Sequence, residues 1–94
     1  MDRDFDDFIW DINKELANVR KHGIDFSTAA RAFNDPCRKV FIDSRHSVHE
    51  PRYFCIGKVM GRIITVRFLY RQGKIRIFGA GYWRMGVRIY EAQG

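Results

Sequence analysis

The spacing of apolar residues changes at Pro36, and this change constrains the fold more than any other feature of the sequence. Before Pro36, apolar residues recur every three or four positions, as on one face of an α-helix. After it, they alternate with polar residues, as in β-strands. A chain that is helical first and β-rich afterwards is typical of α+β proteins. With 94 residues, it has room for one domain with a modest core.

Two helices are predicted before the change of period. Apolar residues at helical spacing mark the first helix: Ile9, Ile12, Leu16 and Val19. Asp11 can cap its N-terminus, and Gly23 follows its last turn. A second, shorter helix shows the same spacing with Phe26, Ala29, Ala30 and Phe33. Asp25 can cap this helix, and Pro36 stops it because the residue before a proline avoids the helical region.

Four strands and a last helix are predicted after Pro36. The strands cover residues 38–43, 52–58, 62–70 and 74–80, and the helix covers residues 82–92. Two of the connections are as short as hairpin turns, which favours an antiparallel meander. We therefore expect an antiparallel four-stranded sheet with two N-terminal helices and one C-terminal helix, and with the helices mostly on one face.

The charge of the chain is unevenly distributed. Residues 1–11 contain five Asp and one Arg and sum to −4, so the remaining residues must carry +10 to give the net charge of +6. Most of these bases are arginines, whose planar guanidinium grips phosphate oxygens in pairs and stacks on bases. A polyanionic partner is therefore expected, and RNA or DNA is favoured over a membrane because no Lys-rich cluster or long basic amphipathic helix is present.

The acidic N-terminal segment differs from a secretory signal, which begins basic and continues into an apolar stretch. The longest apolar run is also far shorter than a membrane span. Two cysteines, Cys37 and Cys55, are too few for a disulfide framework. We therefore expect a cytoplasmic protein in which both thiols are reduced and lie in the core.

A zinc site is the alternative use of these thiols. Five residues could supply ligands by type: His22, His46, His49, Cys37 and Cys55. Their spacing contains no C-x-x-C or H-x-x-x-H pattern of the kind that marks zinc sites. We therefore expect no metal and no other cofactor.

Basic residues recur on the predicted strands. Four arginines come from this part of the chain: Arg52, Arg62, Arg67 and Arg76. Arg67 alternates with the apolar face of its strand, and Tyr53 and Phe78 lie nearby in the sequence with rings on which bases could stack. These arginines form either an RNA-binding face or an ordinary solvated one.

Lys21 and His22 end the first predicted helix, just before Gly23, and could present two proton-transfer groups to the sheet. The alternative is a pair of cations that only complement the helix dipole. Arg45 and Glu50 stand with His46 and His49 in a polar loop, which either holds a substrate or is simply solvated.

The order and spacing of many residues together resemble the BrnT family of type II toxin-antitoxin modules. In the first half they are Trp10-Asp11, Lys14, Asn18, Lys21-His22-Gly23, Phe26, Ala30, Phe33 and Asp35-Pro36. In the second half they are Asp43, Arg45, His46, Glu50, Arg52, Gly57, Gly61, Lys74-Ile75-Arg76-Ile77 and Tyr90-Glu91. The resemblance implies a RelE-like ribonuclease fold and RNA cleavage without a metal. It also implies neutralisation by a BrnA-like ribbon-helix-helix antitoxin. The toxin itself would then associate with DNA only indirectly, through this antitoxin.

The chain departs from that family pattern in one segment. Family members usually read Ile-Ser-Ala-Arg after the last strand, where this chain reads Phe78-Gly79-Ala80-Gly81. A Glu common in the following helix is replaced by Val87. If the missing Arg stabilises the transition state, activity is attenuated unless Arg76 or Arg84 substitutes. The alternative function is then a binding module that acts only in an antitoxin-DNA autorepression complex.

We accordingly predict a metal-independent endoribonuclease toxin that cleaves RNA by attack of a 2′-hydroxyl on the adjacent phosphate. The predicted catalytic residues are Lys21, His22, Arg45, Glu50 and Arg76. The predicted RNA-binding residues are Arg52, Arg62, Arg67 and Arg84. Trp83, Val87 and Tyr90 have helical spacing and form either a core stripe or the antitoxin-binding surface.

Overall fold

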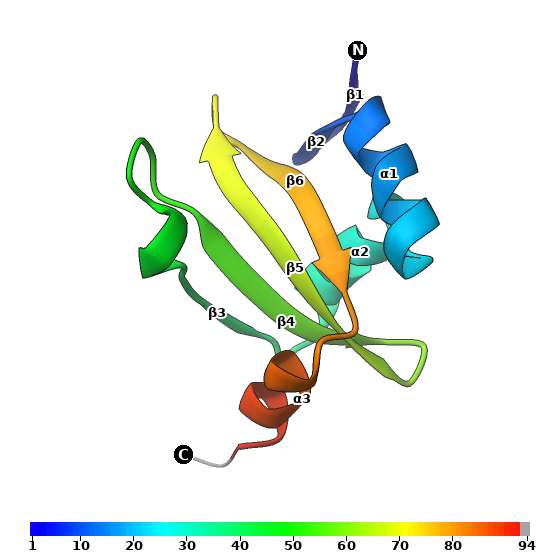
Figure 1. Ribbon diagram of the computed structural model, residues 1–94, viewed down its shortest axis with the longest axis vertical. Helices are drawn as coiled ribbons and strands as arrows, with labels where there is room; N and C mark the ends of the chain where they lie inside the picture. The colour runs from blue at the N-terminus through cyan, green and yellow to red at the C-terminus, as the bar shows by residue number, and fades with distance from the viewer. Residues whose placement is uncertain (93–94) are drawn as a thin grey trace.

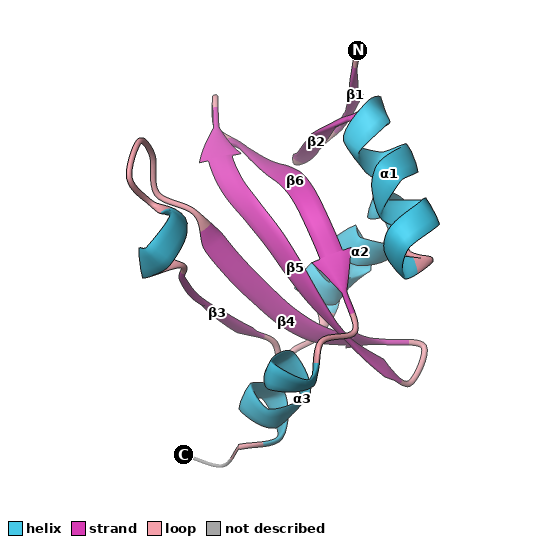
Figure 2. Cartoon of the chain, viewed as in Figure 1, coloured by secondary structure: helices cyan, strands magenta, loops and turns pink. Residues whose placement is uncertain are grey.

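A six-stranded mixed sheet carries the fold of the computed structural model, which describes residues 1–92 (Figure 1). The strands are β1 (Asp2–Phe5), β2 (Phe8–Asp11), β3 (Lys39–Ile42), β4 (Tyr53–Val59), β5 (Arg62–Arg71) and β6 (Lys74–Gly81). The helices are α1 (Ile12–His22), α2 (Phe26–Ala30) and α3 (Arg84–Glu91), with the 3-10 turns η1 (Arg31–Asn34) and η2 (Ser44–His46). The strand order is β1-β2-β6-β5-β4-β3, so β1 and β3 are the two edges (Figure 2).

The predicted antiparallel four-stranded sheet is wrong, because the acidic N-terminal segment adds two strands. β1 and β2 form a hairpin whose turn contains Asp6 at φ 47°, and β2 then runs parallel to β6, with Phe8 opposite Ile75. The sequence pattern predicts no element for this acidic segment. Such charges are in fact suited to an edge strand, since they discourage further strand pairing.

The prediction that the helices lie mostly on one face is also wrong. We call the face with Ile64 and Val66 the back face and the face with Thr65 and Arg67 the front face, since side chains alternate along β5. α2 and η1 cover the back face, whereas α3 crosses the front face, where Gly86 packs directly against Thr65 (Figure 1). α1 lies beside β6, next to β2.

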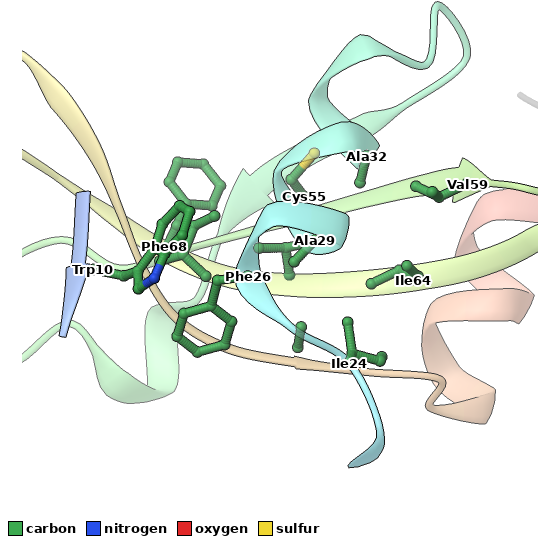
Figure 3. Packing of buried hydrophobic residues seen from close by; sticks show 12 residues of the cluster. Trp10, Ile24, Phe26, Ala29, Ala32, Cys55, Val59, Ile64 and Phe68 are labelled. Carbon is green, nitrogen blue, oxygen red and sulfur yellow. The ribbon is translucent and has the colours of Figure 1, made fainter. Parts of the chain in front are cut away.

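The main core lies between the back face and α2 with η1 (Figure 3). Its buried apolar residues include Trp10, Ile24, Phe26, Ala29, Ala32, Cys55, Val59, Ile64 and Phe68. Gly57 allows the close approach of η1 to β4, because a Cβ at this position would lie 2.3 Å from the Ala32 carbonyl oxygen. Burial raises the pKa of the Cys55 thiol to about 12, which keeps it neutral. Cys37 is exposed, so its predicted place in the core is wrong.

The ends of α1 lie where the sequence predicts them. The Asp11 carboxylate accepts from the backbone N–H groups of Asn13 and Lys14, and Gly23 adopts φ 70° after the last turn. The apolar residues that mark this helix in the sequence are not all buried, however: Leu16 is 52% exposed and Val19 41%. No helix in residues 1–92 is long and apolar enough to cross a bilayer.

The inward side of α1 is polar instead. Glu15 accepts from the Trp10 indole N–H (3.1 Å) and from the Phe26 backbone N–H (2.9 Å), so one carboxylate joins β2, α1 and α2. The Asn18 side chain is buried. These polar contacts, and not a hydrophobic stripe, determine how α1 is rotated against the sheet.

Candidate functional site

A hollow of about 300 Å³ lies where the end of α1 meets the front face of the sheet. Its lining is rich in bases and aromatic rings: Lys14, Lys21, His22, Arg67, Phe78 and Trp83, with Ala17, Asn18 and Gly79 between them. We call this the α1 hollow. A concave surface with several cations and exposed rings is suited to a single-stranded polyanion whose bases can stack.

Asn18 positions α1 over this hollow. Its side-chain NH₂ donates to the carbonyls of Ile24 (2.9 Å) and Ala80 (3.0 Å), and its side-chain oxygen accepts from the Ala80 N–H (3.1 Å). The amide thus takes the place of a further strand beside β6 at Ala80. Lys14 lies four residues before Asn18, and Lys21 lies three residues after it. At these spacings the three side chains share one side of the helix, so both lysines point toward the hollow.

His22 lies half-buried at the end of α1, with its ring edge-on to the Trp83 indole at 5.3 Å between centroids. The indole in turn fills the space beside Gly81, where an added Cβ would lie 2.6 Å from a ring carbon. Lys21 is exposed at the rim. The hollow therefore contains one imidazole, held by aromatic packing, beside a solvated ammonium group.

Two guanidinium groups approach the same aromatic ring on the front face. The Cζ atoms of Arg52 and Arg67 each lie 5.0 Å from the centroid of the Phe78 ring. Contacts of this kind hold a cation in a fixed direction while leaving its N–H groups free to bind phosphate. Arg67 lines the α1 hollow and Arg52 lines a neighbouring one, so the Phe78 ring links the two.

This neighbouring hollow, which we call the loop hollow, is about 290 Å³ and is lined by Arg45, His46, Val48, His49, Glu50 and Arg52. Glu50 accepts from Arg71 at 2.8 Å, which ties the loop to the end of β5. Two predicted catalytic residues, Arg45 and Glu50, thus lie together, but in a hollow separate from that of Lys21 and His22.

Arg76 is engaged by an acid from the other end of the chain. Its two terminal nitrogens donate to the Asp2 carboxylate at 2.9 and 3.1 Å. This hydrogen-bonded pair raises the pKa of Arg76 and lowers the pKa of Asp2. Arg76 is on the front face like Arg67, since it pairs with Leu69 across β5.

The remaining predicted residues do not join these hollows as one group. Arg62 packs over the Tyr82 ring, 3.5 Å from its centroid, and shares the parity of the back face with Ile64. Arg84 is exposed at the start of α3. Trp83 lines the α1 hollow, whereas Tyr90 lines a different hollow, where its hydroxyl donates to Asp35 at 2.6 Å. Val87, which lies between them in the sequence, is half-buried.

Sequence reasoning missed Lys14 and Asn18 as parts of this site. A signal was present, because residues 14, 18 and 21 share one face of a helix. The apolar spacing of Leu16 and Val19 marks the opposite side of the helix, which is exposed in the structure. Within residues 1–92, no group of three or more His, Cys, Asp or Glu side chains could hold a metal ion.

The comparison with protein families bears on this surface directly. Residues 10–85 match the family model described as ribonuclease toxin, BrnT, of type II toxin-antitoxin systems. No curated protein matches the chain closely enough to be named as a relative. The matched range contains every residue of the α1 hollow and the loop hollow, while β1 lies outside it. With four-fifths of its length matched in this way, the chain belongs to the BrnT family of ribonuclease toxins, which act on RNA and have an antitoxin partner.

Proposed function

We propose that this chain is a cytoplasmic, metal-independent endoribonuclease toxin whose reaction takes place in the α1 hollow. The observation that carries this proposal is the gathering of Lys21, His22 and Arg67 around one concave surface beside the Phe78 ring. RNA cleavage by its own 2′-hydroxyl needs a proton acceptor, a proton donor and cations around the phosphate, and these side chains supply each kind of group.

In the proposed reaction, neutral His22 takes the proton of the 2′-hydroxyl as its oxygen attacks the adjacent phosphorus. The bond from phosphorus to the 5′ oxygen breaks, and the Lys21 ammonium donates a proton to that leaving oxygen. Arg67 stabilises the charge that develops on the phosphate oxygens. The products are a 2′,3′-cyclic phosphate and a 5′-hydroxyl, and the next phosphates along the strand extend past Arg52 to Arg45 in the loop hollow.

Neutralisation is proposed to occur through a BrnA-like ribbon-helix-helix antitoxin that contacts α3 near Trp83. Because the Trp83 indole lies against His22 and lines the α1 hollow, a partner seated on it would also obstruct the RNA. DNA would then be bound by the antitoxin and not by this chain. This arrangement would couple recognition of the antitoxin to inhibition.

A second candidate function rests on Gly79 and Gly81. Where the BrnT pattern has Ser and Arg, this chain has no side chain, and the Trp83 ring fills the space beside Gly81. Removing one transition-state donor typically costs a factor of ~100 to 1000 in rate. A toxin weakened to that degree would act chiefly as a binding module in an antitoxin-DNA repression complex.

Purified protein incubated with RNA, with and without EDTA, tests the proposal. We expect cleavage that survives chelation and leaves cyclic phosphate ends, detected by end-specific labelling. His22→Gln should lower the cleavage rate by a factor of ~100 or more while RNA binding is kept. Intact RNA at high enzyme excess, together with retained RNA binding, would favour the binding module.

Binding is tested separately with Lys21→Ala. Loss of one phosphate contact should weaken the affinity for single-stranded RNA and reduce the slope of log K against log salt by about 0.7. The matched control is Arg20→Ala, which removes one charge from the same exposed helix turn outside the hollow. Equal effects of the two substitutions would remove Lys21 from the proposed RNA contact.

A further inference from the structure

β1 brings two carboxylates to the basic side chains of β6. Asp2 forms the bidentate pair with Arg76, and Asp4 pairs with the Lys74 ammonium group. Both pairs line a hollow of about 220 Å³, the β1 hollow, together with Arg71, Gln72 and Ile9. Two of the five Asp residues that give residues 1–11 their net charge of −4 are thus paired with particular bases of β6.

The β1 hollow continues the basic surface already described. Arg67 and Arg71 are four residues apart on β5 and point to the same face, and Lys74 lies opposite Arg71 across the hairpin. A row of cations therefore runs along the front face from the α1 hollow to β1. At one end of the row Arg67 lies over the Phe78 ring, whereas at the other end two bases are already paired with acids.

The geometry of the Asp2 pair is that of a phosphate contact. Two parallel N–H···O bonds from one guanidinium group are how Arg binds either a carboxylate or two oxygens of a phosphodiester. The two acids are also accessible: the Asp2 side chain is 45% exposed and that of Asp4 59%. Their partner bases are less open, Lys74 at 32% and Arg76 at 16%, so an entering phosphate reaches each pair from the side of the carboxylate and competes with that carboxylate for the base.

The exchange requires little movement. β1 is held to β2 by its backbone over four residue pairs, and the Ile12 N–H donates to the Met1 carbonyl at 3.1 Å. Rotation of the two Asp side chains would free Arg76 and Lys74 while the strand stays in place. β1 also lies outside residues 10–85, the part of the chain that matches the BrnT family model.

We propose that Arg76 and Lys74 form a second phosphate-binding subsite for RNA, and that Asp2 and Asp4 occupy it as internal phosphate mimics when RNA is absent. The inference rests on the proposed function, because it extends the RNA path that begins in the α1 hollow. RNA phosphates entering this subsite displace the two carboxylates. β1 therefore lowers the affinity for RNA and most strongly opposes short strands, which have few phosphates to compete with it.

The test compares two double variants with the same net charge. Asp2→Asn with Asp4→Asn removes the mimics, and Asp6→Asn with Asp7→Asn removes two exposed charges from the turn of the same hairpin. The probe is a fluorescent single-stranded 2′-O-methyl oligoribonucleotide, which lacks the attacking hydroxyl. We expect the first variant to bind about fivefold more tightly than the second. Its salt slope should exceed that of the second by about 1.4, for two added phosphate contacts.

Arg76→Ala is then added to each background. It should change the Kd by less than about twofold in the wild type, where Asp2 occupies Arg76, and should remove most of the gain in the Asp2→Asn, Asp4→Asn variant. Circular dichroism and thermal melting check that all variants are folded. Equal affinities of the two double variants would overturn the proposal, as would an unchanged gain after Arg76→Ala.

Failure of this inference can be told apart from failure of the proposed function. If the wild type binds the probe and loses affinity with Lys21→Ala but not with Arg20→Ala, the α1 hollow stands. Equal double variants in that case overturn only the subsite at β1. If no variant binds the probe, both the subsite and the RNA path through the α1 hollow are overturned.

Discussion

Gly79 and Gly81 stand two residues apart on β6, and their surroundings differ sharply. A Cβ at Gly79 would meet the Arg67 side chain at 3.5 Å, an ordinary contact, whereas a Cβ at Gly81 would lie 2.6 Å from the Trp83 ring. Since that ring also packs against His22, any side chain at Gly81 would disturb the imidazole. Gly79 is thus an open position, while Gly81 belongs to the packing of the site.

We predict that Gly81→Ala lowers the free energy of unfolding by ~1–3 kcal/mol, because the indole must move to admit a methyl group. Gly79→Ala should change it by less than ~0.5 kcal/mol. Urea denaturation measures both. Similar costs for the two substitutions would show that the Trp83 ring does not constrain Gly81. Gly81→Arg should therefore be tested together with Trp83→Ala, which clears the space for the larger side chain.

At the scale of the elements, the docking of α1 depends on one buried amide. Asn18 satisfies both backbone groups of Ala80 on the side of β6 away from β5, which β2 does not reach at that point, and it also satisfies the carbonyl of Ile24. Leaving such buried groups without partners costs more than the hydrogen bonds themselves contribute. α1 is therefore held at the α1 hollow by a polar contact between residues 62 positions apart in the chain.

We predict that Asn18→Leu lowers the free energy of unfolding by roughly 2–4 kcal/mol, although it adds apolar volume. Native-state hydrogen exchange should show a loss of protection at the Ala80 amide. The control is Val19→Ala, which alters the exposed side of the same helix and should change the stability by less than ~0.5 kcal/mol. Unchanged exchange at Ala80 in Asn18→Leu would contradict the proposed role of the amide.

The docking of α3 depends on a different polar contact. The Tyr90 hydroxyl donates to Asp35, whose carboxylate also accepts from the backbone N–H groups of Lys58 and Cys37. The hydrogen bond from Tyr90 is the main reason that the pKa of Asp35 is lowered below 3.8, and it raises the pKa of Tyr90 to about 12.

This pair predicts a defined pH dependence of stability. The lowered pKa of Asp35 contributes stability that is present above pH 3.8 and is lost as the pH falls through the folded-state pKa. The raised pKa of Tyr90 contributes stability that is present below pH 10 and is lost as the pH approaches 12. Tyr90→Phe should therefore be less stable than the wild type by a constant amount from pH 5 to 9. The difference should shrink below pH 4, as urea titrations at each pH would show. A difference that persists unchanged at pH 2 would contradict this.

In the whole molecule, the two faces of the sheet differ in what they contact: one is buried in the core and the other is largely open and basic. The back face and α2 hold the core, while the front face presents Arg52, Arg67 and Arg76. α3 covers one end of the front face and leaves the remainder open to the α1, loop and β1 hollows (Figure 1).

We predict that charge removed from the front face affects RNA binding more than charge removed behind the core. Arg67→Ala should reduce the salt slope by about 0.7, whereas Arg31→Ala, in η1 over the back face, should leave it unchanged. Both variants lose one charge, so a difference reports position. Equal slopes would mean that binding follows net charge alone.

Local signals predicted more of this molecule than long-range ones could. The caps Asp11, Gly23 and Asp25 act within a few residues, and for this reason both ends of α1 and the start of α2 agree with the structure. The sequence predicts that the second helix continues through Phe33, but α2 ends at Ala30 and the chain continues as the 3-10 turn η1. The pairing of β2 with β6 and of Asp2 with Arg76 depends on contacts more than 60 residues apart, which no local pattern encodes. In the same way, Lys21 and His22 could be selected as candidates, but not the hollow that joins them to Arg67.

The parallel pairing of β2 with β6 has a consequence for how the protein is made. Strand β2 and helix α1 leave the ribosome well before their neighbours on β6, Ile75 to Ala80, are synthesised. Because a residue can pack only against residues that have already been synthesised, a nascent chain released before Ala80 would have no partner for Asn18 and no wall opposite Lys21. A product truncated before Ala80 would therefore lack a complete α1 hollow, where RNA cleavage is proposed to occur.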